Sequence, residues 1–216
     1  MELLVISHMY PKKTHPTHGI FVHHQARALQ EEGLALRVVS PLPWTPFPLP
    51  LLSGKWRRYA TVPPFQEWEG IPVHYSPYLA LPGGLGYARG GERIYRRARP
   101  LVDQLHRESP LQLIHAHTAL PDGQAALHLS RRLGLPFVVT IHGQDLQQTI
   151  HRSPAGERAV AEVIAAAARV FLVSGKLDRL ARRHFPQHED KYRVVPGGID
   201  PRLLFKGESP LARQYR

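Results

Sequence analysis

The stretch PFVVTIHGQD at residues 136–145 decides the fold, because an apolar, β-branched run ends there abruptly in polar residues and glycine. A run of this length after Gly134 is typical of a parallel strand covered on both faces, whereas a helix needs a longer periodic pattern. Ligands of open α/β sheets bind in the crevice beyond the carboxyl ends of such strands. We therefore expect His142 at the edge of the sheet where chemistry is usually done.

Similar apolar runs alternate with helical patterns along most of the chain. Strands are predicted at residues 3–7, 36–40, 111–115, 170–173 and 192–195, an edge hairpin at 65–75, and helices at 19–32, 87–107, 122–133, 153–167 and 174–181. The proline-rich residues 41–59 predict no regular element, and Asp122 is expected to cap a helix. This alternation favours an α/β fold, a doubly wound and mostly parallel Rossmann-like sheet with helices on both faces.

The composition limits the classes of protein and partner. The 216 residues suffice for one domain with a sizeable core, and their net charge of +11 favours partners that bear phosphate or carboxylate. Without cysteine, the chain forms no disulfide and no thiolate metal site, which fits a reducing compartment. The absence of asparagine beside 21 prolines resembles the composition of heat-adapted, thermophile proteins.

Membrane and targeting signals are not evident in the sequence. No apolar run reaches the roughly 18 residues of a spanning helix. The acidic start Met1-Glu2-Leu3 also differs from a secretory signal. We expect a cytoplasmic location.

Polar clusters follow five of the predicted strands. They are Ser7-His8, residues 115–118, residues 142–145, residues 174–176 and residues 196–200. Parallel strands bring their carboxyl ends to one edge, so a shared cleft is predicted there. Neither a dinucleotide fingerprint nor a phosphate-loop motif is present, and His115 with His117 has no evident third metal ligand. We therefore expect no cofactor and no metal.

Five motifs in order carry a family resemblance. They are Tyr10-Pro11 with Gly19, residues 113–117, residues 140–145, Val173-Ser174, and residues 195–200 with Phe205. Their order and spacing resemble the amino-terminal domain of retaining glycosyltransferases of family 4, or glycosyl transferase group 1, which have the two-domain GT-B fold. Two positions depart from the family pattern: His18 stands where a second glycine is common, and Gly197 stands where an asparagine is common.

The resemblance implies a division of the protein into domains. Residues 1–196 would form the Rossmann-like acceptor domain, and residues 197–216 would begin the linker between domains. The carboxyl-terminal domain that binds the nucleotide sugar would be absent from this chain. The complete protein would transfer a hexosyl-type sugar, with retention, from a nucleotide-sugar donor to a hydroxyl of a sugar, glycolipid or lipid-linked acceptor. The isolated domain is expected to be inactive.

The resemblance also implies roles for single residues. His142 would be the catalytic residue that contacts the transferred sugar and stabilises positive charge at its anomeric carbon; the alternative is a histidine that packs a strand end. Gly19, with His18 and Gly143, would contact the donor phosphates or sugar; the alternative for Gly19 is an ordinary turn glycine. The candidates for acceptor binding are His117, Thr118, Asp145 and Lys176. Asp145 would equally suit a helix cap, and Lys176 a solvated helix face.

A second class of function stays open at this stage. A basic stand-alone module would bind an anionic lipid surface or nucleic acid. Nucleic acid is disfavoured because the arginine-rich residues 89–99 carry few aromatic side chains for base stacking. The same helix beside the apolar residues 44–56 would suit a peripheral contact with the inner face of a membrane, which is compatible with the enzyme.

Overall fold

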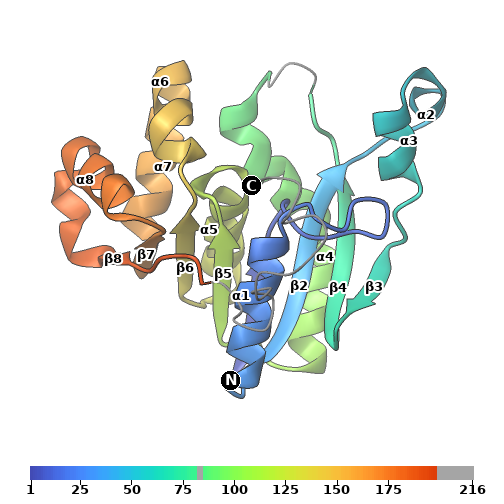
Figure 1. Ribbon diagram of the computed structural model, residues 1–216, viewed down its shortest axis with the longest axis horizontal. Coiled ribbons are helices and arrows are strands. Elements are labelled where there is room, and N and C mark those ends of the chain that lie inside the picture. The colour runs from blue at the N-terminus through green and yellow to red at the C-terminus, as the bar shows by residue number, and fades with distance from the viewer. Residues whose placement is uncertain (82–84, 199–216) are drawn as a thin grey trace, which may run out of the picture.

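The computed structural model describes residues 1–81 and 85–198. Within these residues the strands are β1 (Glu2–Ile6), β2 (Ala35–Pro43), β3 (Phe65–Trp68), β4 (Ile71–Tyr78), β5 (Leu113–His117), β6 (Phe137–Ile141), β7 (Arg169–Leu172) and β8 (Tyr192–Val194). They form one sheet in the order β3-β4-β2-β1-β5-β6-β7-β8 (Figure 1). All neighbours are parallel except β3 and β4. The predicted doubly wound, mostly parallel sheet is confirmed.

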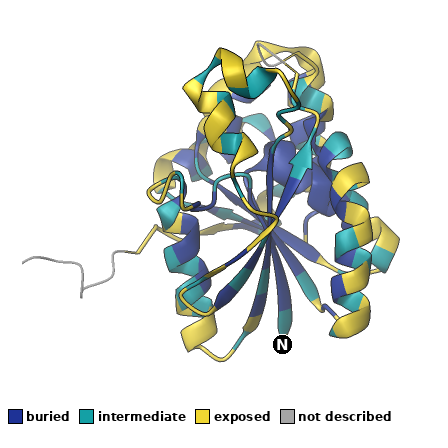
Figure 2. Cartoon of the chain, turned by 90° about the vertical axis from the view of Figure 1, so that its right-hand side faces the viewer, coloured by how far each residue is buried: buried dark blue, intermediate teal, exposed yellow. Residues whose placement is uncertain are grey.

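Helices cover the sheet. Their bounds are α1 (Ile20–Glu31), α2 (Leu49–Leu52), α3 (Gly54–Ala60), α4 (Gly90–Glu108), α5 (Gln124–Leu133), α6 (Ile150–Arg152), α7 (Pro154–Ala166) and α8 (Gly175–His184). Short helical turns lie at Tyr87–Arg89, Ala119–Gly123, Asp145–Thr149 and Pro186–Lys191. The central strands are dark with buried residues between the helical layers in Figure 2.

The two faces of the sheet bury separate apolar cores, and strand alternation explains the division. Leu3 and Val5 of β1 pack with α1, whereas Leu4 and Ile6 pack with α4, α5, α7 and α8 on the other face. Because α1 follows β1 and leads to β2, while the later helices lead in the opposite direction along the sheet, right-handed crossovers place them on opposite faces. The carboxyl ends of β1, β5, β6 and β7 therefore meet beside the amino-terminal end of α1.

Several local predictions are wrong. The proline-rich segment is not irregular throughout: β2 continues to Pro43, and α2 and α3 follow. Pro50 is tolerated in the first turn of α2, where its missing N–H has no helical partner to lose. Ser53 caps α3 by accepting a hydrogen bond from Lys55 N. The helix expected at 87–107 is α4, which continues without interruption through Pro100, an exposed residue opposite the buried stripe of the helix.

The predicted motif at residues 196–200 lies only partly within the described residues. Val195 continues the edge of the sheet by donating its N–H to Leu172 O at 2.9 Å, and the chain is described as far as Gly198. Ile199, Asp200 and Phe205 lie outside the described residues. Most of the predicted linker at 197–216 lies outside them as well.

Candidate active site

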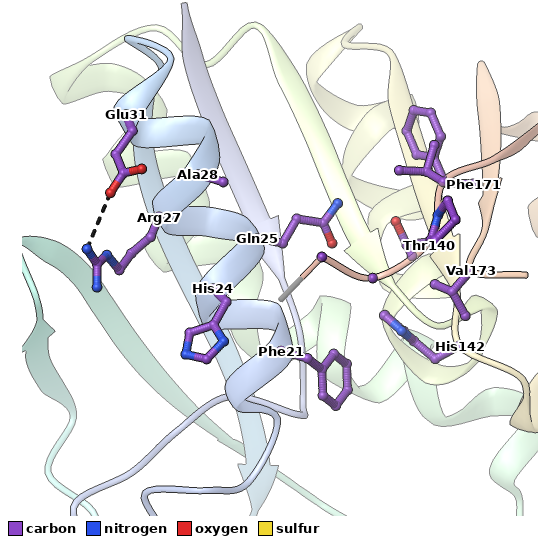
Figure 3. A pocket seen from close by; sticks show the side chains of 14 residues that line it. Phe21, His24, Gln25, Arg27, Ala28, Glu31, Thr140, His142, Phe171 and Val173 are labelled. Carbon is purple, nitrogen blue, oxygen red and sulfur yellow. Dashed lines mark hydrogen bonds and ion pairs between the residues drawn. The ribbon is translucent and has the colours of Figure 1, made fainter. Parts of the chain in front are cut away.

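A cavity of about 530 Å³ lies between α1 and the carboxyl ends of β6 and β7. Figure 3 shows α1 on one side of it and His142, Thr140 and Phe171 on the other. Its lining residues are Phe21, His24, Gln25, Arg27, Ala28, Glu31, Thr140, His142, Phe171, Val173, Val195, Pro196, Gly197 and Gly198. The described part of the motif after β8 thus reaches the same cavity as the motif after β6. The three other polar clusters of the shared-cleft prediction, at residues 7–8, 115–118 and 174–176, do not line it.

His142 is half-buried on the wall of this cavity, directly after β6. Its ring lies 4.7 Å from the ring of Phe21 of α1, which fixes its orientation from the opposite wall. Its Nε2 lies 3.1 Å from Nδ1 of His117. Burial and, to a smaller extent, the charge of His8 together lower the pKa of His142 to about 4. The imidazole is therefore neutral near pH 7.

His142 is the outermost of three stacked histidines. The rings of His115 and His117 lie 4.5 Å apart, and those of His117 and His142 lie 5.4 Å apart at 14°. At the inner end, His115 Nε2 lies 2.7 Å from the hydroxyl of Thr140. Burial lowers the pKa of His115 to about 4 and the pKa of His117 well below 6.5. The stack is therefore uncharged, and it supports His142 through packing and one hydrogen bond.

The sequence did not predict the pair formed by the partly exposed His8 and the buried Asp122. The carboxylate of Asp122 accepts from His8 Nδ1 at 2.7 Å and from the backbone N–H of His8. Burial lowers the pKa of His8, but the attraction of Asp122 is larger in sum, so the pKa is raised overall. Asp122 does not cap α5 as predicted, because its oxygens are occupied by His8. The position of His8 directly after a predicted strand was a sequence signal for a site residue, whereas nothing in the sequence connected Asp122 with His8.

Two of the acceptor candidates are buried: Thr118 in the loop after β5, and Asp145, which follows β6 and is hydrogen-bonded to that loop. Asp145 is 1% exposed, and its carboxylate accepts from the backbone N–H groups of Ala119 and Leu120 at 3.0 and 3.1 Å. Thr118 has φ of 85°, which is strained for a β-branched residue, and its hydroxyl donates to Leu120 O at 2.9 Å. Neither lines the cavity, so both stabilise the loop behind it. Asp145 also does not cap its own helix.

The other predicted site residues are divided between the cavity region and the outer surface. Gly19 is the amino-terminal cap of α1 with φ of 68°, and no side chain caps that helix end. His18 lies just before it, in the loop between β1 and α1. Gly143 follows His142 with φ of 130°. Lys176 is exposed in the first turn of α8 and lines neither the cavity nor the histidine stack.

Neither a metal centre nor a membrane span is found within residues 1–81 and 85–198. No three His, Asp or Glu side chains there are grouped so that they could hold a metal ion. None of the described helices is both long enough and apolar enough to cross a membrane.

Solved structures share the arrangement of sheet and helices. The catalytic domain of starch synthase IV from Arabidopsis thaliana, bound to ADP and acarbose, matches with a TM-score of 0.56 at 14% identity, over 97% of this chain and 54% of that one. UGT89C1 of the same plant, complexed with UDP, matches with a TM-score of 0.55 at 12% identity, over 99% of this chain and 53% of that one. At these identities the likeness shows the fold alone, which is one half of a GT-B protein.

The sequence then places the chain more narrowly. Residues 18–203 match glycosyltransferase family 4, and the chain belongs to that family. It is 33% identical over 183 residues to TuaC of Bacillus subtilis, a glycosyltransferase named for teichuronic acid biosynthesis. That match covers 85% of this chain and 46% of TuaC, so the chain spans about half the length of this relative. The predicted family and the predicted GT-B half are both confirmed.

Proposed function

We propose that this chain is the acceptor-side domain of a retaining glycosyltransferase that uses a nucleotide-sugar donor. Residues 1–196 form this domain in the proposal, residues 197–216 begin the linker, and a second domain supplies most of the donor site. The observation that carries the proposal is the neutral His142 on the wall of a 530 Å³ cavity at the carboxyl ends of the parallel strands. In the proposed reaction, a hexosyl-type sugar moves to an acceptor hydroxyl in that cavity.

The proposed reaction balances without any added reagent. The bond between the anomeric carbon and the diphosphate oxygen breaks, and the acceptor oxygen bonds to the same face of that carbon. The proton of the acceptor hydroxyl passes to the departing diphosphate. Positive charge develops on the sugar because the bond to the diphosphate breaks before the bond to the acceptor has formed. Groups that stabilise this transient charge more than the ground state accelerate the reaction.

His142 suits that task because its ring is uncharged. An imidazolium would repel a developing positive charge, whereas a neutral imidazole offers a nitrogen lone pair and an N–H. Its Nε2 is engaged with His117 at 3.1 Å, which leaves Nδ1 for the substrate. Burial and the nearby charge of His8 both lower its pKa, so the neutral form is kept over the physiological pH range.

The start of α1 supports the proposed contact with donor phosphate. Helix amino termini carry free N–H groups and a partial positive charge that favour anions. Gly19 lets the loop approach closely there, since a Cβ at this position would lie 2.3 Å from Met9 O. Gly143 flanks this end of the cavity in the proposal, whereas the side chain of His18 lines a separate cavity. His117 acts through His142 and not by direct contact with an acceptor, because it is 1% exposed.

The deciding experiment compares the 216-residue chain with the complete gene product. Sugar transfer from a panel of nucleotide sugars is expected only when the second domain is present, because a GT-B active site forms between two domains. Turnover by the 216-residue chain at the rate of the complete protein would overturn the division of roles. No transfer by the complete protein with any donor, despite a native fold, would overturn the proposed activity.

We also propose a peripheral contact with an anionic membrane surface, made by residues 44–52, which include α2, and by α3. Four large apolar side chains are exposed there: Trp44 at 54%, Phe47 at 83%, Leu51 at 66% and Leu52 at 72%. Lys55, Arg57 and Arg58 follow in α3. Apolar groups beside cations are the combination that interfacial helices use. In this proposal the membrane contact belongs to the glycosyltransferase, and we prefer it to the alternative of a stand-alone module that binds lipid or nucleic acid.

The basic side of α4 is a poorer candidate for that contact than its sequence indicates. Arg93 donates to the carbonyls of Leu79 and Gly86, and Arg97 donates to the carbonyl of Pro77. Arg96 is paired with Glu92. Arg93 and Arg97 thus hold α4 against the end of β4 and the residues that follow it. The charges of the three arginines are therefore partly offset by contacts within the domain.

A further inference from the structure

A second cavity, of about 210 Å³, lies between the loop after β1 and helix α3. Its lining residues are Lys12, Thr14, His15 and His18 from the loop, and Lys55, Arg58 and Tyr59 from α3. None of them lines the His142 cavity. The two cavities are therefore separate spaces: residues of α1 line the first, and the loop that leads into α1 lines the second.

The lining of this second cavity is cationic and contains no carboxylate. Within residues 1–81 and 85–198, no ion pair joins Lys12, Lys55 or Arg58 to an aspartate or glutamate. Other cations of the domain are paired, such as Arg132 with Asp103 at 2.8 Å. Three cations that share a cavity without a counter-charge repel one another, so an anion in the cavity would stabilise them.

Among the lining residues, Lys12 is the strongest evidence for an anion site, because its charged side chain is buried. It is 2% exposed, and its Nζ donates to Tyr10 O at 2.9 Å and to His18 Nδ1 at 3.3 Å. An ammonium group has three donors, so one is left for a ligand. Burial lowers the pKa of Lys12 to about 8, which reflects the cost of a buried charge that no carboxylate offsets.

His18 adds a neutral donor to the same cavity. Burial, followed by the charge of Lys12, lowers the pKa of His18 to about 4, so the ring is neutral near pH 7. Its Nδ1 accepts from Lys12, which places the ring proton on Nε2. The hydroxyl groups of Thr14 and Tyr59 complete a lining that is rich in donors. Such a lining matches the oxygen atoms of a phosphate or carboxylate.

We propose that this cavity binds a phosphate or carboxylate group carried by the acceptor, and so selects acidic acceptors. This inference rests on the proposed transferase function. The cavity holds a small charged group and not a whole nucleotide, because it is below the roughly 300 Å³ at which pockets for larger ligands begin. Its place fits this role: Phe21, one helical turn from His18, contacts His142 with its ring 4.7 Å away. An acceptor anchored by its anion would extend its hydroxyl past this end of α1 toward His142.

The test measures binding to the 216-residue chain without any turnover. Calorimetric titrations use glucuronate and glucose 6-phosphate, each compared with neutral glucose, at low and near-physiological salt. We expect both acidic sugars to bind about tenfold more tightly than glucose, because a charge-assisted hydrogen bond is lost with the neutral sugar. Equal binding of glucose and the two acidic sugars overturns the proposal.

Three variants locate the binding. Arg58→Gln removes a cation that lines the cavity, and Arg57→Gln removes its exposed neighbour in α3, which does not line the cavity. Lys12→Met removes the buried ammonium while it keeps the length of the side chain. The acidic sugars are expected to bind about tenfold more weakly to Arg58→Gln and Lys12→Met and unchanged to Arg57→Gln. Equal losses of affinity in Arg57→Gln and Arg58→Gln would mean that the acidic sugars respond only to the overall positive charge of the surface, and would overturn the proposed site. Thermal melts check that each variant is folded.

Two further probes identify the source of the anion. Monomeric short-chain phosphatidylglycerol, kept below the concentration at which it forms micelles, assigns the anion to a lipid-borne acceptor if it binds in an Arg58-dependent and Arg57-independent manner. Uridine diphosphate that binds in this manner, while the acidic sugars do not, assigns the cavity to the donor and overturns the acceptor role. Because no arm of the test requires sugar transfer, failure of the anion site and failure of the transferase proposal give different results.

Discussion

The Nε2 atom of His142 lies 3.1 Å from the Nδ1 atom of His117, and the two rings are stacked with 14° between their planes. The residues come from the ends of neighbouring strands, β5 and β6, which pair His117 with Thr140 in parallel register. The contact holds one nitrogen of His142 and leaves the other for a substrate. The parallel pairing of β5 and β6 therefore sets the position of the residue proposed to contact the transferred sugar.

Replacement of His142 should lower kcat more than it raises KM in the complete enzyme. The interaction is proposed to strengthen as charge develops, so its loss affects the transition state more than substrate binding. Removing one such contact typically lowers the rate by about two to three orders of magnitude. We expect this loss in His142→Ala and also in His142→Phe, which keeps a ring against Phe21.

The two variants separate chemistry from packing. If His142→Phe retains activity within a few-fold of wild type while His142→Ala does not, the ring acts by filling space beside Phe21. Activity within a few-fold in both variants would make His142 a structural histidine. Steady-state kinetics and thermal melts of the complete enzyme supply both readouts.

The histidine stack should make the domain less stable as the pH falls from 6.5 to about 4. The pKa of His115 is about 4 in the folded state, below its ordinary 6.5, so the unfolded chain binds more protons over that window. Each pKa unit corresponds to about 1.4 kcal/mol, so His115 alone lowers the free energy of unfolding by roughly 3 kcal/mol at the acid end. Above pH 6.5 this contribution is fully present.

Urea unfolding of wild type and His115→Gln at several pH values isolates this effect. Glutamine is uncharged at every pH, and its amide can still bond to the hydroxyl of Thr140. Asp145 acts in the opposite direction, since burial raises its pKa to about 6 and stability from that group increases as the pH falls from 6 to about 4. The difference between the two proteins removes that background. An unchanged difference between pH 7 and pH 4.5 would contradict the prediction.

The sequence predicted the sheet and its reactive edge because both follow from local patterns. The β-branched run before His142 gave a strand, and alternation with helices gave parallel neighbours whose ends meet. The His8–Asp122 pair was not predictable in this way, because 114 residues separate partners that only the fold brings to 2.7 Å. The burial of Asp145 was missed for the same reason: a polar residue after a strand is usually exposed, but this one is bonded to a distant loop.

The helices of the proline-rich segment were missed for a different reason. Proline is unfavourable inside helices, yet Pro50 lies in the first turn of α2, where that penalty is absent. Short helices with exposed apolar residues also lack the buried periodic stripe on which sequence prediction depends. The cavity formed by α3 with the loop after β1 was consequently outside the reach of sequence reasoning.

Gly19→Ala should destabilise the domain more than Gly33→Ala. Both glycines have positive φ, 68° and 84°, so each alanine carries a similar backbone cost of about 1 to 2 kcal/mol. At Gly19 the new Cβ would also lie 2.3 Å from Met9 O, whereas no atom lies within 4 Å of a Cβ at Gly33. Overpacking typically adds about 1 to 3 kcal/mol. Chemical denaturation measures the difference, and equal losses in the two variants would contradict the close approach of Gly19 to Met9 within the loop between β1 and α1.

The apolar surface formed by residues 44–52, which include α2, should bind anionic vesicles. Phe47 and Leu52 are 83% and 72% exposed, and polar replacement of both removes apolar area that would enter the lipid interface. We expect Phe47→Ser/Leu52→Ser to weaken co-sedimentation with phosphatidylglycerol vesicles about tenfold or more, with little change in thermal stability, because neither side chain belongs to a buried core. Phe65→Ser is the matched control, since Phe65 is also exposed, at 48%, but lies on the edge strand β3.

Salt separates the two parts of this proposed membrane contact. Each cation near an anionic surface contributes on the order of 1 kcal/mol, and this part weakens with added salt, whereas the apolar part is far less sensitive. Binding of wild type should therefore fall at high salt without disappearing, and Arg57→Gln should remove part of the salt-sensitive fraction. Binding that disappears entirely at high salt, or that Phe65→Ser weakens as much as the double variant, would show that α2 does not enter the interface. Absence of binding at low salt would remove the membrane contact from the proposal and leave a transferase with a soluble acceptor.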